Sequence, residues 1–516
     1  MSLNSDLFKS LKKVSRYAKQ KSTKSTKSTK STKSTKSTTI AKKKTIKSNK
    51  PIKTAKTQLI NSTNTIKSIK YKFNELYKTK LIELFYSLDN TINTTLIKYN
   101  DRETRTLLRA KYAPFHLCSA YGLDILDSYF DRINAAYIVK NNLLESMNLA
   151  RAPVIVRNTF EDFTRGLAQF ITNRYGKSLP HFKASNAFMK MWEILSTFDI
   201  IPTSQSNFKV FHIAEAPGQM ILATQYYSRK KCRNISQDKY DWRANSLNPF
   251  NKTLQAEYGE TKIFGDDYGL IKGNPQRWLW GADNTGDITR PENIKWFRNY
   301  IRNKWLTNPN DKLDLIVGDG GLATYTGLDP LLLQKLDLAQ VITVIACSSP
   351  GGSCVIKHFT PYIKRHKGTY EASGFFIGFL YLYYVAFEHV SLFKPYSSNP
   401  DSGEFYVVGQ GFQGIEPESL ERLYRILYKL ELNSGIIPMA DIPETFIGQI
   451  NRFLERMTDL NTTAIEKQNL LLTCYKEGEN PKIKKYLKCD RFLDADNLQN
   501  IQVPRFNEWI KKYKFI

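Results

Sequence analysis

A short apolar run that ends in an acid and a tight turn constrains this chain more than any other stretch. It covers residues 208–219, FKVFHIAEAPGQ. The β-branched and aromatic residues favour a buried strand, and Pro217 and Gly218 predict a sharp turn, because proline fixes φ and glycine lacks a Cβ. Residues 219–230 then carry helical apolar spacing. A strand, a glycine turn and a helix N-terminus together can form a nucleotide-cofactor pocket, although many such turns bind nothing.

The positive charge of the chain is concentrated near its start. The net charge is +28 over 516 residues, and residues 1–70 contain 20 Lys/Arg against the single acid Asp6. Residues 21–38 are six KST triplets. Residues 1–70 contain too few apolar side chains to offset the entropy that the backbone would lose on folding. We therefore predict a disordered basic tail over 1–70. Such a tail is either a solubilising segment or a nucleic-acid tether or nuclear signal.

Cysteines and histidines are too scattered to predict a zinc site or a disulfide framework. Six of each occur, without a CxxC pair. We therefore expect no metal and a reducing, intracellular compartment. The most apolar run, 375–387, is too short to span a bilayer, and the N-terminus lacks the apolar region of a secretory signal. No membrane association is expected.

Helical patterns lie on both sides of a central α/β region. Apolar residues three and four apart predict a helical domain over 71–170 and a helical C-terminal region over 413–516. The basic, aromatic end RFNEWIKKYKFI makes the C-terminal region either a small RNA-binding or docking domain or a structural helical cap. Residues 171–412 remain as the α/β domain, and with 516 residues the chain has room for several such cores.

Four charged residues are predicted to meet at one edge of the central sheet. The continuous apolar run at 313–321, LDLIVGDGG, is typical of a strand buried on both faces of a parallel sheet, and it ends at Asp319. Lys357 lies near the end of SCVIKHF, and Glu404 begins a strand over 404–409. If that last strand is antiparallel, its start lies beside the carboxyl ends of the others. Lys190, on the amphipathic helix 185–195, completes the group, in which each charge shifts the pKa of its neighbours.

A second acidic turn follows a short aromatic segment. We expect a strand over Trp278 to Trp280, followed by a Gly/Asp/Asn-rich turn that contains Asp283 and Asp287. Carboxylates just past a strand end suit hydrogen bonds to ribose hydroxyls or an adenine amine. Aspartate is also a common turn former, so a purely structural role is the alternative.

These motifs, in this order, resemble the FtsJ-type (RrmJ-like) ribose 2′-O-methyltransferases, and most closely the Adrift-like branch, which methylates cap-proximal nucleotides of mRNA. The resemblance covers about residues 170–412. It is carried by AFMKMWEIL, EAPGQ, WRANSLNP, WGADNTGDI, GGSCVIKHF and KPYSSNPDSGEFYVV. Three positions depart from the family pattern, since Gln219 replaces a second glycine, Tyr240 replaces a tryptophan and Ser398 replaces an arginine.

The resemblance implies a fold, a cofactor and a set of site residues. The fold is α/β, a Rossmann-like methyltransferase sheet that is mostly parallel with its last strand antiparallel, flanked by helical N- and C-terminal regions. The cofactor is S-adenosyl-L-methionine (AdoMet). The catalytic residues are Lys190, Asp319, Lys357 and Glu404, and the cofactor contacts are Gly218, Tyr240, Asp283, Asp287 and Asp319.

The same resemblance implies a role for each member of the tetrad. Lys357 is the central base, or else it steers the lone pair of the ribose hydroxyl. Our hypothesis is that Lys190 and partial burial lower the pKa of Lys357 enough for a neutral amine near pH 7. Asp319 then orients Lys357, and Glu404 holds Lys190 or the hydroxyl.

The function that follows is 2′-O-methylation of RNA, with capped mRNA as the expected substrate and other capping or transcription proteins as further partners. Two alternatives stay open, a methyltransferase of rRNA or tRNA and an RNA-binding or virion protein that has lost catalysis. Two lysines kept beside two acids favour an enzyme. The tail and the Asn/Ile/Lys-rich composition resemble those of large DNA viruses, which predicts the cytoplasm, a viral factory or the virion, with the nucleus as the alternative.

Overall fold

The computed structural model describes most of the chain outside its N-terminal region. The described residues are 91–98, 115–118, 124–149, 163–175, 185–201, 207–231, 240–258, 265–321, 329–361, 373–432, 434–478 and 495–516. The predicted tail over 1–70 lies outside them.

The chain divides into two compact units. The first comprises Met1–Ser87, Asn142–Val156 and Asn469–Ile501. Its described part consists of short helical stretches, in which Lys476 Nζ donates a hydrogen bond to Ser146 Oγ at 2.7 Å. The second unit comprises Leu88–Asn141, Arg157–Gln468 and Gln502–Ile516, and it contains the sheet.

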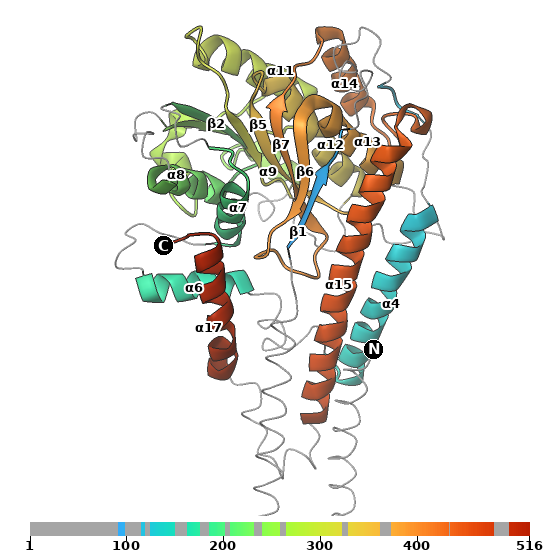
Figure 1. Ribbon diagram of the computed structural model, residues 1–516. Coiled ribbons are helices and arrows are strands. Elements are labelled where there is room, and N and C mark those ends of the chain that lie inside the picture. The colour runs from blue at the N-terminus through green and yellow to red at the C-terminus, as the bar shows by residue number, and fades with distance from the viewer. Residues whose placement is uncertain are drawn as a thin grey trace, which may run out of the picture. The chain divides into compact units, whose positions relative to one another are not determined.

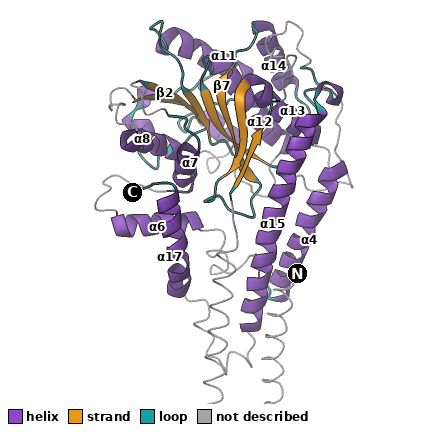
Figure 2. Cartoon of the chain, in the orientation of Figure 1, coloured by secondary structure: helices purple, strands orange, loops and turns teal. Residues whose placement is uncertain are grey.

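Figures 1 and 2 show the strands as one sheet with helices around it. The strands are β1 (Ile92–Leu96), β2 (Phe208–Ile213), β3 (Tyr240–Ala244), β4 (Leu315–Gly318), β5 (Ser353–Phe359), β6 (Phe387–Lys394) and β7 (Glu404–Phe412). The helices of eight or more residues are α4 (Asp124–Ser146), α6 (Phe163–Tyr175), α7 (Asn186–Thr197), α8 (Gln219–Lys231), α11 (Pro291–Tyr300), α12 (Pro330–Cys347), α13 (Ser373–Ala386), α14 (Pro417–Lys429), α15 (Glu444–Gly478) and α17 (Ala495–Lys512). The shorter helical segments are α9 (Lys252–Tyr258), α10 (Leu270–Gly273), η3 (Pro275–Arg277), η4 (Ile301–Trp305) and η5 (Met439–Asp441).

The sheet has seven strands in the order β1-β6-β7-β5-β4-β2-β3. Strands β3, β2, β4 and β5 are parallel, whereas β7 runs antiparallel to both β5 and β6. This confirms the predicted α/β fold with a mostly parallel sheet and an antiparallel last strand. The carboxyl ends of β2, β4 and β5 therefore meet the start of β7 at one edge.

Two hydrophobic cores cover the two faces of the sheet. Successive strand residues point to opposite faces, and in β4 Leu315 and Val317 enter one core while Ile316 enters the other. The first core packs α7 and α8 against the sheet, and the second packs α11, α12 and α13. Burial on both faces explains why β4 reads as a continuous apolar run.

Helix α12 is the most apolar long helix among the described residues. Asp329 caps it by accepting a hydrogen bond from the Leu331 N–H at 2.9 Å, and Pro330 occupies its first turn. By length and composition it is apolar enough to cross a membrane, but 61% of Pro330–Cys347 is buried inside the protein. Its apolar sequence is what a core helix between sheet and outer helices requires.

Two sequence predictions about the sheet need correction. Strand β1 lies inside the region 71–170, predicted to be helical, and pairs antiparallel with β6, with Ile92 opposite Lys394. Its sequence INTTL is rich in β-branched residues, which favour strands. Conversely, Trp278 makes only an isolated parallel bridge to Ala244, and no strand forms over 278–280.

Candidate active site

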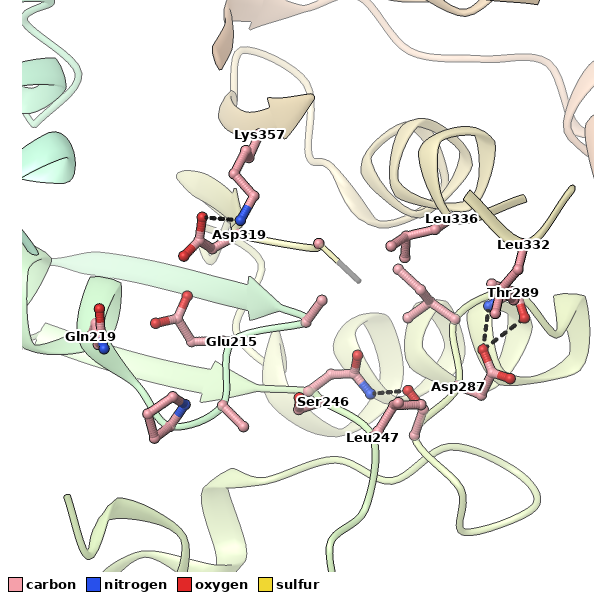
Figure 3. A pocket seen from close by; sticks show the side chains of 17 residues that line it. Glu215, Gln219, Ser246, Leu247, Asp287, Thr289, Asp319, Leu332, Leu336 and Lys357 are labelled. Carbon is pink, nitrogen blue, oxygen red and sulfur yellow. Dashed lines mark hydrogen bonds and ion pairs between the residues drawn. The ribbon is translucent and has the colours of Figure 1, made fainter. Parts of the chain in front are cut away.

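A pocket of about 240 Å³ opens at the carboxyl ends of the parallel strands (Figure 3). It is lined by the turn after β2, the segment after β3, the acidic turn near residue 287, and the ends of β4 and β5. In Figure 3, Asp319 and Lys357 point toward each other at one end, and Asp287 lies with Thr289 at the other. The pocket is therefore at the edge where open α/β sheets bind ligands.

Glu215 occupies the N-terminus of helix α8. Its Oε1 accepts hydrogen bonds from the N–H groups of Met220 at 2.7 Å and Ile221 at 3.3 Å. The side chain is buried, and this burial raises the pKa of Glu215. The carboxylate occupies these N–H groups, so they are not free to bind a phosphate.

The acidic turn is held against the segment after β3 by a buried amide. Asn245 Nδ2 donates to the carbonyl oxygens of Leu279 at 3.1 Å and Gly286 at 3.0 Å. Gly286 has φ of 71°, and a Cβ there would lie 1.8 Å from the Ser246 carbonyl oxygen. Only glycine fits this close approach.

The two aspartates of this turn differ in what they face. Asp287 lines the pocket, and its Oδ1 accepts hydrogen bonds from the Thr289 N–H at 2.9 Å and Oγ1 at 2.7 Å. Asp283 does not line the pocket; it bonds Thr285 and pairs with Arg290 Nη1 at 2.9 Å. The structure therefore gives Asp283 the turn-forming role that was the alternative to a cofactor contact.

The remaining predicted cofactor contacts also separate. Gly218 lies between two lining residues, with φ of 106°, and its N–H donates to the Glu215 carbonyl oxygen at 2.7 Å. Tyr240 is 4% exposed, sits in the core and pairs with Phe208 at the start of β2, the end of the strand away from the pocket. The predicted contact of the Tyr240 ring is thus corrected to a packing role.

The four tetrad residues form two ion pairs beside the pocket. Lys357 Nζ lies 2.9 Å from Asp319 Oδ1, and Lys190 Nζ lies 2.6 Å from Glu404 Oε1. They come from α7, the loop after β4, β5 and the start of β7. Pairing of β5 with β7 brings the lysine strand next to Glu404, because Phe359 lies opposite Glu404 in the register.

Charge interactions within this group oppose the cost of burial. Burial alone would lower the pKa of Lys357, but the carboxylates of Asp319, Glu404 and Glu215 outweigh it and raise that pKa. The hypothesis of a depressed Lys357 pKa is therefore wrong for this structure. Burial likewise opposes ionisation of Glu404, but Lys190, Lys357 and Lys394 lower its pKa to about 2.

Several polar side chains that were not predicted as site residues support the tetrad. Tyr406 Oη donates to Asp319 Oδ1 at 3.4 Å, and Ser398 Oγ donates to Glu404 Oε1 at 2.8 Å. Glu193, one turn after Lys190, accepts backbone hydrogen bonds from residues 396 and 397 and a 2.6 Å bond from Trp509 Nε1. The sequence shows the spacing of Glu193 from Lys190. Its partners could not be predicted, because residues 396 and 397 lie 203 and 204 residues later and Trp509 lies 316 residues later.

The pocket carries an excess of negative charge. Among its described lining residues, the ionisable side chains are Glu215, Asp287, Asp319 and Lys357. Three acids against one lysine favour a ligand with cationic and hydroxyl groups and disfavour a polyphosphate. No group of three or more His, Cys, Asp or Glu side chains placed to hold a metal occurs in the described part of the chain.

Comparison with known proteins agrees with this geometry. Residues 184–412 match the model of the family described as "FtsJ-like methyltransferase". Residues 184–412, called the FtsJ-like domain below, are therefore similar to FtsJ-like methyltransferases. All four tetrad residues and the entire described lining of the pocket lie within this FtsJ-like domain.

Three relatives extend the similarity beyond the FtsJ-like domain. "Uncharacterized protein L511" of Acanthamoeba polyphaga mimivirus is 28% identical, covering 69% of this chain and 40% of that protein. "Cap-specific mRNA (nucleoside-2'-O-)-methyltransferase 2" of Pongo abelii is 25% identical, covering 73% and 47%. "Probable methyltransferase EP424R" of African swine fever virus is 28% identical, covering 55% and 62%. The chain thus spans less than half of the first two relatives.

Proposed function

We propose that this chain is an AdoMet-dependent RNA ribose 2′-O-methyltransferase that acts on a cap-proximal nucleotide of mRNA. The observation that carries the proposal is the pair of lysine–carboxylate contacts, Lys357 with Asp319 in the lining of an acidic pocket and Lys190 with Glu404. The FtsJ-like domain and the cap-specific relative support it.

The lining residues fit AdoMet better than a phosphorylated cofactor. Asp287 and Asn245 offer polar atoms for ribose and base, and Glu215 and Asp319 supply negative charge. Bound there, AdoMet supplies an electrophilic methyl group on a sulfonium, whose positive charge suits this acidic lining.

The protein must align a 2′-hydroxyl with that methyl group and ease the loss of its proton. Lys357 Nζ hydrogen-bonds to the 2′-hydroxyl and directs a lone pair of its oxygen, while Asp319 fixes the position of Nζ. Only a neutral Nζ accepts the hydroxyl proton, so the raised pKa of Lys357 implies a rate that increases with pH. Glu404 holds Lys190, with Oε1 at 2.6 Å from Lys190 Nζ.

Capped mRNA is the proposed substrate because the cap-specific relative covers 73% of this chain. The strongly basic chain suits a polyanionic strand, and capping or transcription proteins are proposed partners in a reducing intracellular compartment. A methyltransferase of rRNA or tRNA is the competing enzyme, and a non-catalytic RNA-binding or virion protein is the competing non-enzyme.

Transfer of labelled methyl from AdoMet to capped and uncapped RNAs of identical sequence separates these functions. Nuclease digestion then locates the label. Label on the ribose of the first nucleotides of capped RNA alone supports the proposal. Equal labelling of both RNAs contradicts the cap assignment, and RNA binding without labelling contradicts catalysis.

A further inference from the structure

A third lysine, Lys394, lies behind the tetrad at the end of β6. It has no exposed surface and does not line the pocket. Its Nζ donates hydrogen bonds to the carbonyl oxygens of Ser402 at 2.7 Å and Glu404 at 3.0 Å, and contacts Ser398 Oγ at 3.3 Å. The lysine thus joins the end of β6 to the start of β7.

These contacts continue to the tetrad through one hydroxyl. Ser398 Oγ, which Lys394 contacts, donates to Glu404 Oε1 at 2.8 Å, and the same Oε1 lies 2.6 Å from Lys190 Nζ. Lys394 therefore fixes Glu404 twice, at its backbone carbonyl and, through Ser398, at its carboxylate. Fully buried donors held by three acceptors have little freedom to move.

We infer that Lys394 is a positioning residue for the tetrad and that it holds the Glu404 carboxylate within reach of Lys190. This inference rests on the proposed function. A buried lysine is costly, because burial penalises its charge. Replacing the lysine by an apolar side chain would fill the same space, but the Glu404 carbonyl and the Ser398 hydroxyl would lose the hydrogen bond from Lys394 Nζ. The Ser402 carbonyl would keep only its hydrogen bond from Asn461 Nδ2 at 3.1 Å.

The charged groups that face Lys394 come from three elements. The net pKa of Lys394 is about 7. Burial lowers this pKa most and Lys190 on α7 also lowers it, whereas Glu404 on β7 and Asp401 in the preceding loop raise it. Lys394 therefore changes charge near neutral pH, close to a carboxylate whose own pKa is about 2. This adds a pH dependence to the tetrad that a purely structural side chain would not produce.

The test compares Lys394→Met and Ser398→Ala with wild type in methyl transfer from AdoMet to RNA, as profiles of log kcat against pH. We expect kcat to fall about 100-fold in Lys394→Met and about 10-fold in Ser398→Ala, because small misplacements of catalytic groups cost that much. The wild-type profile should show a break near pH 7 that Lys394→Met lacks. AdoMet affinity should stay within about twofold, since neither side chain lines the pocket.

The matched control is Lys209→Met. Lys209, on β2, is a mostly buried lysine that forms ion pairs with Asp241 and Asp311, away from the pocket. This variant should keep both kcat and the wild-type pH profile. Wild-type kcat and pH profile in both Lys394→Met and Ser398→Ala would overturn the inference, and if Lys394→Met does not fold, the Ser398→Ala result decides.

A second readout separates this inference from the proposed function. The rate at which an amine-reactive acylating reagent labels Lys190, followed by mass spectrometry, needs no catalysis. Labelling should increase several-fold in Lys394→Met and Ser398→Ala, because Glu404 is then no longer held against Lys190. If wild type methylates no RNA, the proposed function fails, yet unchanged Lys190 labelling in the variants would still reject the positioning role and increased labelling would support it.

Discussion

Lys357 and Lys394 are two lysines of one sheet whose surroundings shift their pKa values in opposite directions. Both interact with Glu404, but Lys357 also faces Asp319 at 2.9 Å, whereas Lys394 is surrounded by carbonyl and hydroxyl oxygens. The pKa of Lys357 is raised, and that of Lys394 falls to about 7. Burial penalises both ammonium groups, so a carboxylate in direct contact decides which lysine keeps its proton.

The largest change is expected from Asp319→Asn, which removes the acid that distinguishes Lys357 from Lys394. The pKa of Lys357 should fall, and the pocket should lose one of its three acids. Lys357 loses the carboxylate that orients its Nζ, and the pocket loses negative charge beside the cofactor. These two losses should outweigh the larger fraction of neutral Lys357, so kcat/KM should drop by about 10³-fold. Steady-state methyl transfer measures this. Equal kcat/KM in wild type and variant would show that the contact is not used.

Glu404→Gln removes the carboxylate that interacts with both Lys190 and Lys394. It should lower kcat by about 100-fold, since Lys190 loses its carboxylate. It should also lower the free energy of unfolding by about 3 kcal/mol, because the partly buried Lys190 and the buried Lys394 are left with one acid fewer. Urea unfolding measures the stability. A variant as stable as wild type would show that Glu404 is not the acid that stabilises these lysines.

The difference between wild type and Lys394→Met in the pH dependence of stability reports on Lys394. Its pKa is about 7 in the folded protein and 10.5 ordinarily, so between these values the unfolded state binds more protons. The free energy of unfolding should therefore rise with pH, by at most about 1.4 kcal/mol per pH unit. The raised pKa of Lys357 acts only above 10.5. The pKa values of Lys230, Lys231 and Lys467 are also lowered, so these lysines contribute to the rise in both proteins. Between pH 7.5 and pH 9.5 the free energy of unfolding should rise more steeply in wild type than in Lys394→Met, and parallel curves would contradict the lowered pKa of Lys394.

Tyr240→Phe should have the smallest effect. The ring packs in the core, away from the pocket, so AdoMet affinity should change by less than about twofold. Asp287→Ala serves as the comparison, because Asp287 lines the pocket and should weaken AdoMet binding more. Isothermal titration calorimetry distinguishes them. A larger loss in Tyr240→Phe would show that the Tyr240 hydroxyl contacts the cofactor.

Local patterns predicted the central sheet well, and long-range pairing explains the failures. The apolar run at 313–321 and the start of the last strand at Glu404 are properties of a few consecutive residues, and the structure has both. Strand β1 was missed because its stability comes from pairing with β6, about 300 residues later in the chain. Trp278 failed as a strand because it lies against β3 through a single bridge.

The site shows the same limit. The types and order of the tetrad residues could be predicted, and the structure brings them into two ion pairs, but their protonation could not. The pKa of Lys357 depends on Asp319, Glu404 and Glu215, which reach it from three separate segments. Lys394 is the last residue of strand β6, and nothing in the local sequence shows that its ammonium group turns back to Ser402.

The most direct test of this account measures methyl transfer and AdoMet binding together in wild type and Lys357→Met. Wild type should place labelled methyl on the ribose of RNA, and Lys357→Met should lower kcat by about 10³-fold while AdoMet affinity stays within about threefold. Methyl transfer at the wild-type rate by Lys357→Met, or no transfer by a wild-type protein that binds both AdoMet and RNA, would contradict the account.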